Sequence, residues 1–186
     1  MKEINTRIAF AGNAFTKLTN IWKSKDLNTH TKIKLFRSCV IPVLTYGCES
    51  WKSSSQIDKK LDSFENKCLR KLLNIKWSDF ITNNIVRDKT NQEFVSNIVR
   101  KRRWKYLGNV LRSDEKRLNR QVLVWSPEGK RKRGRPKSTL RKTILQESTQ
   151  IGCNTIQDLQ LLATNRTTWR CKTSALCAAF GTKGTN

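Results

Sequence analysis

The chain has 186 residues, of which 38 are Lys or Arg and 14 are Asp or Glu, so its formal net charge at pH 7 is +24. Such a surplus predicts a polyanionic partner, either nucleic acid or an anionic membrane surface. The hydrophobic content of 37%, with six Trp and seven Phe, is too high for a disordered chain. No apolar run reaches the ~18 residues that span a bilayer, and the first residues do not resemble a secretion signal.

The six cysteines do not predict a metal centre. No two of them have the Cys-x-x-Cys spacing of a zinc site, and without a secretion signal a disulfide framework is not expected. We interpret Cys39, Cys68 and Cys177 as small apolar residues on buried helix faces. The sequence therefore predicts no metal and no cofactor.

The N-terminal part predicts amphipathic helices. Residues 3–23 carry apolar side chains at steps of three and four, typical of a helix that packs onto a larger body. Asn28 or Thr29 can cap a second helix, which Pro42 kinks or ends. A third amphipathic helix is predicted over residues 55–73.

Residues 39–51 are densely apolar and indicate the buried centre of this half. They include Glu49, which we interpret as a structural carboxylate bonded to backbone amides or an Arg rather than as a catalytic group. The only histidine, His30, lies alone in a polar segment, and we find neither a carboxylate pair suited to metals nor a Gly-rich phosphate loop. We therefore expect no enzymatic activity from this chain.

A long basic helix is predicted next. Thr90, with Glu93 three residues further on, has the spacing of a capping box for a helix that runs to about residue 112. Residues 101–105 place four cations and Trp104 on it. Trp104 can stack on a nucleobase or cover the edge of the core, and both alternatives stay open.

The rest of the chain predicts a connection and a small helical unit. Pro136 suits the first position of a helix that runs to about residue 149, and Thr155 can cap the next one. We find almost no alternation typical of strands, so the predicted fold class is all-α. The expected division is a helical bundle over 1–112, a basic linker over 113–136, a helical unit over 137–180 and a disordered tail over 181–186.

Residues 130–137, which we call the basic strap, read Lys-Arg-Lys-Arg-Gly-Arg-Pro-Lys. This charge density, together with Gly and Pro, predicts an extended surface segment. The strap lies within residues 101–142, which hold 16 Lys or Arg against 3 acids, a net charge of 16 − 3 = +13.

The strap is either a solvated basic loop or a binding element. Its Arg-Gly-Arg-Pro core resembles an AT-hook, which inserts Arg side chains into an A·T-rich minor groove, and the run also suits a nuclear import signal.

Lys and Arg bind the phosphates of nucleic acids and release condensed counterions, whatever the base sequence. The predicted nucleic-acid contacts are therefore the cations of the long helix and of the strap, with one aromatic residue. They are Arg102, Arg103, Trp104, Lys105, Lys130, Arg131, Lys132, Arg133, Arg135 and Lys137.

Four sequence motifs, in this order, resemble a known family. They are Val43–Trp51, similar to LLYGCETW; Arg102–Arg112, similar to RRLRWLGHVLR; Val124–Pro136, similar to WNPQGKRKRGRP; and Asn165–Arg170, similar to DRxxWR. The resemblance covers nearly the whole chain. The four motifs resemble the C-terminal region of endonuclease–reverse transcriptases from LINE-like, RTE-type non-LTR retrotransposons. The chain departs from the family pattern at Asn109, where the family has His, at Leu140, where it commonly has Trp, and at Asn165, where it has Asp.

The resemblance implies that residues 1–112 form a thumb-like bundle that grips the template–primer duplex. In the family the fingers, the palm with its catalytic aspartates, and the endonuclease precede this region, and we expect them to be absent here. The expected function is thus non-catalytic binding of template RNA, target DNA or a hybrid duplex, in the nucleus or with element RNA in the cytoplasm. The missing palm is a further expected partner, and a membrane is not. The alternatives are a nuclear AT-hook-like DNA-binding protein of retrotransposon origin and an inert product of a degenerate element.

Overall fold

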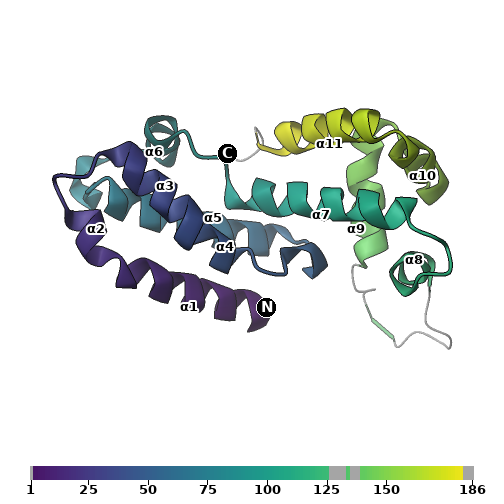
Figure 1. Cartoon of the computed structure of the whole chain (residues 1–186), viewed down its shortest axis with the longest axis horizontal. Helices are drawn as coiled ribbons and strands as arrows, with labels where there is room; N and C mark the ends of the chain where they lie inside the picture. Colours follow the sequence, from purple (N-terminus) through teal and green to yellow (C-terminus); the bar gives the residue numbers. More distant parts are fainter. Residues whose placement is uncertain (1, 126–132, 135–138, 182–186) are drawn as a thin grey trace. The chain divides into compact units, whose positions relative to one another are not determined.

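A computed structural model describes residues 2–125, 133–134 and 139–181 of the chain. Within these residues the secondary structure is helical, without strands, which confirms the predicted all-α class (Figure 1). The α-helices are α1 (Lys2–Lys17), α2 (Thr19–Lys23), α3 (Thr29–Cys39), α4 (Ile41–Leu44), α5 (Ser55–Leu72), α6 (Asn83–Thr90), α7 (Val95–Arg112), α8 (Leu118–Val124), α9 (Leu140–Ser148), α10 (Ile156–Thr164) and α11 (Arg166–Gly181). Short 3-10 turns lie at Cys48–Ser50, Trp77–Asp79 and Thr149–Ile151.

The chain forms two compact units. The N-terminal unit comprises Met1–Cys48 and Ser54–Val99, and the C-terminal unit comprises Glu49–Ser53 and Arg100–Asn186. The sequence had predicted a boundary after residue 112. The division instead falls inside α7, between Val99 and Arg100. The reason is that the later turns of α7 bury Trp104 and Leu107 in the core of the C-terminal unit.

The segment after α7 also differs from the predicted linker. Residues 118–124 form α8, and its Leu123 side chain is buried in the same core as Trp104. Arg120 of α8 is buried as well and donates a hydrogen bond to the side-chain oxygen of Gln160. The first part of the expected linker is therefore a packed helix.

The N-terminal unit is built on the apolar stripe predicted for residues 3–23. This stripe is buried, but the expected single helix is interrupted at Leu18, between α1 and α2. Trp22 explains the turn, because its indole stacks on Phe15 at 5.0 Å and its Nε1 donates to the Phe15 carbonyl at 2.7 Å. The buried ammonium of Lys32 donates to the carbonyl oxygens of Trp22 and Ser24, and so satisfies the C-terminal end of α2.

The local caps of the N-terminal unit follow the sequence in part. Asn28 caps α3, as predicted, since its Oδ1 accepts from the amide of Thr31 at 2.7 Å. The predicted capping box of Thr90 is wrong. Thr90 is the last residue of α6, and its hydroxyl donates back to the carbonyl of Val86 at 2.8 Å, whereas α7 begins only at Val95.

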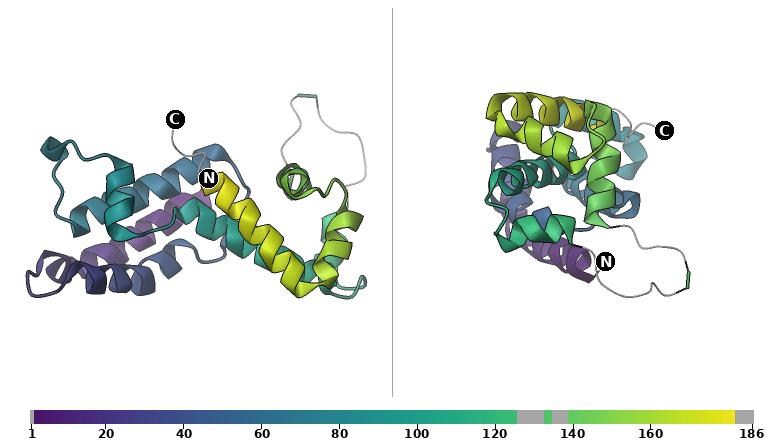
Figure 2. Two further views of the ribbon diagram at one scale, coloured as in Figure 1. Left: turned by 90° about the horizontal axis from the view of Figure 1, so that it is seen from above. Right: turned by 90° about the vertical axis from the view of Figure 1, so that its right-hand side faces the viewer.

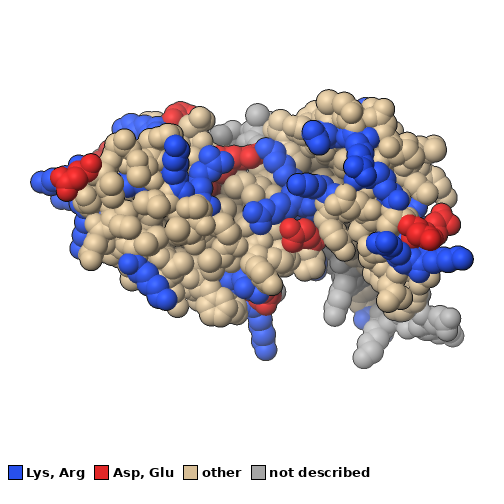
Figure 3. Space-filling model, viewed as in Figure 1, with Lys and Arg blue, Asp and Glu red and all other residues tan. Residues whose placement is uncertain are grey.

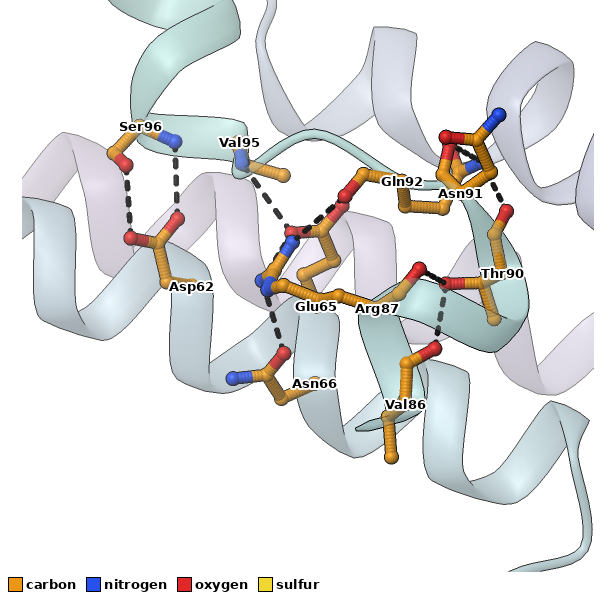
Figure 4. Close-up of polar contacts among 10 residues, drawn as sticks. All are labelled: Asp62, Glu65, Asn66, Val86, Arg87, Thr90, Asn91, Gln92, Val95 and Ser96. Carbon is orange, nitrogen blue, oxygen red and sulfur yellow. Dashed lines mark hydrogen bonds and ion pairs between the residues drawn. The ribbon is translucent and has the colours of Figure 1, made fainter. Parts of the chain in front are cut away.

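Two carboxylates of α5 cap the start of α7 instead (Figure 4). Asp62 accepts from the amide of Ser96 at 3.0 Å and from its hydroxyl at 2.8 Å, and Glu65 accepts from the amide of Val95 at 3.3 Å. These bonds satisfy amides that have no partner within the helix and place negative charge at its positive end. The cap of α7 therefore comes from residues about thirty positions earlier in the chain.

Glu65 is also the centre of a buried polar cluster. Arg87 donates to its Oε2 at 2.9 Å and to Asn66 Oδ1 at 2.9 Å (Figure 4). The guanidinium of Arg87 also lies 3.5 Å from the ring centroid of Phe94. Burial raises the pKa of Glu65 to about 7, although the charge of Arg87 acts in the opposite direction. Protonation of Glu65 in the folded state is thus favoured over protonation in the unfolded chain.

This pKa predicts a specific dependence of stability on pH. The folded-state pKa of Glu65 lies above the unfolded value, so its contribution to the free energy of unfolding is full below pH 4.5 and is lost as the pH rises through about 7. Subtracting the unfolding free energy of Glu65→Gln from that of the wild type, measured by urea denaturation at several pH values, should give a difference that falls over this range by on the order of 2–3 kcal/mol.

Glu3→Gln is the matched control, because the Glu3 side chain is 56% exposed and pairs only with Arg7 on the same helix. Its unfolding free energy should follow the pH dependence of the wild type. Equal pH slopes for Glu65→Gln and the wild type would show that Glu65 does not titrate in this way.

Candidate nucleic-acid interface

The C-terminal unit is organised around α7 from Arg100 onward. Helices α9 and α11 both lie against this part of α7, as two views show (Figures 1 and 2). One side of α7 faces the core with the residues Trp104, Leu107, Val110 and Leu111. They pack against buried residues of the other helices, namely Leu123, Ile144, Leu159, Ala163, Trp169, Leu176 and Cys177.

A single buried carboxylate, Glu147 of α9, accepts hydrogen bonds from two side chains on this inner side of α7. It accepts a hydrogen bond from Arg103 Nη2 at 2.5 Å and one from Trp104 Nε1 at 2.7 Å. Arg100 Nε lies 3.6 Å from the same carboxylate. Arg100 and Arg103 are therefore both paired inside the protein, and Arg103 is one of the 16 cations of residues 101–142.

This arrangement corrects two of the predicted nucleic-acid contacts. Arg103 is 4% exposed and Trp104 is 1% exposed, so neither can meet a nucleic acid in this conformation. Of the two alternatives for Trp104, the structure supports its place in the core. The missing signal was Glu147, which lies 43 residues further along the chain and has no sequence pattern that links it to α7.

The contact between α7 and α11 depends on a glycine. A Cβ atom added at Gly108 would lie 2.4 Å from Nε1 of Trp169, and the two indoles of Trp104 and Trp169 lie 5.7 Å apart between ring centroids. Gly108 and Trp169 belong to two different motifs of the family resemblance. These motifs thus meet in space and form the core of one unit.

The outer side of α7 carries polar and cationic residues at helical spacing. Arg102, Lys105, Asn109 and Arg112 follow one another at steps of three, four and three. Arg112 donates to Asn109 Oδ1 at 2.8 Å and to the carbonyl of Ala163 at 3.1 Å. These contacts fix the guanidinium of Arg112 beside the start of α11.

Helix α11 continues this distribution of charge. Burial, and then the charge of Arg166, lower the pKa of Arg112, so the two guanidinium groups are electrostatic neighbours. Arg170 lies one turn after Arg166, and both are exposed. Figure 3 shows Lys and Arg side chains gathered over α7 and α11. We call the set Arg102, Lys105, Arg112, Arg166 and Arg170 the basic face.

The structure tests the predictions for the strap only in part. Arg133 is exposed, next to Gly134 with a φ of +126°. Five further predicted contacts lie outside the described residues: Lys130, Arg131, Lys132, Arg135 and Lys137. The predicted helix start at Pro136 also lies outside the described residues, and the described helix α9 begins at Leu140 with an extended Thr139 as its cap. Thr155 caps α10 as predicted, in a capping box with Asp158.

The structure also shows where the cysteines and Glu49 lie. Cys68 and Cys177 are buried as predicted, whereas Cys39, at the end of α3, is exposed. Glu49 is half-buried on the 3-10 turn Cys48–Ser50. In the described part of the chain no three His, Cys, Asp or Glu side chains gather in a way that could hold a metal ion. No described helix is both long and apolar enough to cross a membrane.

Comparison with protein-family models gives a match in the N-terminal unit. The model of a domain of unknown function, DUF6451, matches residues 14–46, which run from the end of α1 to α4 in the N-terminal unit. No curated protein and no solved structure matches the chain. The matched segment contains no residue of the basic face.

The close approach at Gly108 predicts a clear stability effect. Gly108→Ala forces a methyl group against the buried indole of Trp169, which cannot move away without disturbing the core, and should lower the free energy of unfolding by about 1–3 kcal/mol. Gly12→Ala is the matched control in α1, where the nearest atom, on Phe64, is 3.9 Å from the added Cβ.

Because alanine is the better helix former, Gly12→Ala should leave the protein as stable or stabilise it by up to ~1 kcal/mol. Both variants are compared by chemical denaturation followed by circular dichroism. If the Gly108→Ala variant were as stable as the Gly12→Ala variant, this result would contradict the close approach of α7 and α11 at Gly108.

Proposed function

We propose that the chain binds RNA or DNA through the basic face of its C-terminal unit. Its role is that of the non-catalytic region that follows the palm in non-LTR retrotransposon reverse transcriptases. The observation that carries the proposal is the division of the cations of α7 between a buried inner side and an outer side. Arg103 is held inside by Glu147, while Arg102 and Lys105 lie on the outer side with the cations of α11.

The chemistry of the basic face suits phosphate groups. Arg and Lys side chains pair with phosphate oxygens, and each neutralised phosphate releases condensed counterions. The neighbouring guanidinium groups of Arg112 and Arg166 repel each other, and a polyanion relieves that repulsion. The net charge of +24 extends the attraction beyond the contact surface.

The family resemblance supports the same proposal independently of charge. Two of its motifs, Arg102–Arg112 and Asn165–Arg170, supply all five residues of the basic face as well as Gly108 and Trp169. The partners we propose are template RNA, target DNA or their hybrid, and a reverse-transcriptase palm. The proposed location is nuclear, or cytoplasmic when element RNA is bound.

Salt dependence tests the basic face. The logarithm of the binding constant for a duplex should fall linearly with the logarithm of the salt concentration. In the double variant Lys105→Ala/Arg170→Ala, the magnitude of this slope should decrease by about two, since each lost phosphate contact removes about one unit. Fluorescence anisotropy with a labelled duplex between 50 and 200 mM salt, a range of about fourfold, measures both quantities.

A double variant with the same change of net charge provides the control. Lys25→Ala/Lys59→Ala removes two exposed lysines of the N-terminal unit, so its slope should stay close to that of the wild type. If both double variants lost the same amount of binding, the net charge rather than the basic face would account for the attraction. A binding constant that does not respond to salt would contradict phosphate contact altogether.

Arg133 tests the alternative of an AT-hook-like protein. If the strap acts through charge, Arg133→Ala weakens binding to A·T-rich and G·C-rich duplexes by similar factors, and this is the outcome we expect. A loss confined to A·T-rich duplexes would instead support minor-groove insertion. Competition with the two unlabelled duplexes at one salt concentration distinguishes these results.

A further inference from the structure

A pocket of about 510 Å³ lies on the outer side of α7, within the C-terminal unit. Its lining residues are Glu49, Arg102, Lys105, Tyr106 and Asn109. The four residues from α7 share one face of the helix, because their spacing is three, one and three. Glu49 comes from the 3-10 turn Cys48–Ser50 and adds the only negative charge among the lining residues.

These side chains are more varied than phosphate binding requires. Arg102 and Lys105 supply positive charge, but Tyr106 presents an aromatic ring that is 48% exposed. Asn109 offers an amide oxygen and amide protons, although its oxygen already accepts from Arg112. The carboxylate of Glu49 accepts hydrogen bonds and repels phosphate. An intact duplex has phosphates for the cations, yet its bases are stacked and paired and cannot reach the ring of Tyr106.

We propose that this pocket binds one unpaired nucleotide of a single strand. Its phosphate pairs with Arg102 and Lys105, and its base stacks on Tyr106. The free amide protons of Asn109 and the carboxylate of Glu49 hydrogen-bond to the edge of the base. The inference rests on the proposed function and specifies it: the basic face holds the backbone of a nucleic acid, and the pocket selects a strand with an exposed base.

The charge of Glu49 gives the proposed nucleotide one favoured orientation. The lining combines one carboxylate with two cations, so the cations take the phosphate and the carboxylate takes the N–H groups of the base. The volume agrees with this ligand, since pockets for small molecules measure about 300–1,000 Å³. Because Tyr106 is half-exposed, its side chain can be removed without opening the core.

The experiment compares a single strand with a blunt duplex of the same sequence, both measured by fluorescence anisotropy at one salt concentration. Tyr106→Ala should weaken binding of the single strand by about 5- to 100-fold, the effect of losing one stacked base, while binding of the duplex changes less than about twofold. Tyr106→Phe keeps the ring and should bind both ligands like the wild type. Circular dichroism verifies that each variant is folded.

Tyr46→Ala is the matched control, because Tyr46 is the other tyrosine of the chain and is 67% exposed in the N-terminal unit. It should change binding of neither ligand. Glu49→Gln removes the negative charge, and we expect it to increase duplex binding and so to lower the preference for the single strand over the duplex.

The outcomes separate the pocket from the wider proposal. If the wild type binds neither ligand, the proposed function fails. If the wild type binds both ligands, and Tyr106→Ala weakens binding of both equally or of neither, the proposed role of the basic face is retained. The inference about the unpaired nucleotide is then overturned. A selective loss of single-strand binding in Tyr106→Ala, with no loss in Tyr106→Phe or Tyr46→Ala, supports the pocket.

Discussion

The contact of Glu147 with Arg103 and Trp104 determines which residues of α7 reach the surface. A buried Arg is costly unless a carboxylate neutralises it, and the indole N–H of a buried Trp also needs an acceptor. Glu147 meets both needs from one position on α9. Once residues 103 and 104 point inward, the helical period of 3.6 residues directs residues 102, 105, 106 and 109 outward. The composition of the pocket and of the basic face therefore follows from an interaction in the core. Removing Glu147 would leave Arg103 and Trp104 without these hydrogen-bond partners. The rotation of α7 about its axis would then be less well defined, although no surface charge had been changed.

Gly108 has the corresponding role for α11. The absence of a side chain at this position allows the indole of Trp169 to lie against the backbone of α7, next to Trp104. That closeness has an electrostatic consequence, because it also brings the charge of Arg166 near the guanidinium of Arg112. The contact between Gly108 and Trp169 holds α7 and α11 together, whereas the like charges of Arg112 and Arg166 repel each other. Arg112 is held in place by Asn109 and by the carbonyl of Ala163, so its charge keeps a fixed position in spite of that repulsion.

The sequence predicted what depends on neighbouring residues and missed what depends on distant ones. The buried stripe of residues 3–23 follows from periodicity, and the caps at Asn28 and Thr155 follow from bonds that span three residues. Thr90 had the same local signature, yet the chain ends a helix there, because Asp62 and Glu65 already satisfy the first amides of α7. The inward position of Arg103 and Trp104 was equally invisible, since a run of cations on a helix gives no sign of which member has a buried partner. The sequence could therefore place candidate contacts on α7, but only the structure shows that Tyr106 and Asn109 line a pocket there and that Arg103 and Trp104 are buried.

The two ends of α7 are stabilised by different chemistry. Its first turn depends on the carboxylates of Asp62 and Glu65, and burial raises the pKa of Glu65 to about 7. Its later turns depend on apolar burial and on Glu147, in a core that does not include the α5 cap. The influence of a helix cap fades within the first turn. Arg102 already lies two turns from Val95, so a change in the protonation of Glu65 alters the free energy of unfolding without moving the pocket residues. Changes of the pocket residues leave the contacts of Glu147 and Gly108 in place, so the proposed roles of the basic face and the pocket can be tested in a protein that remains folded.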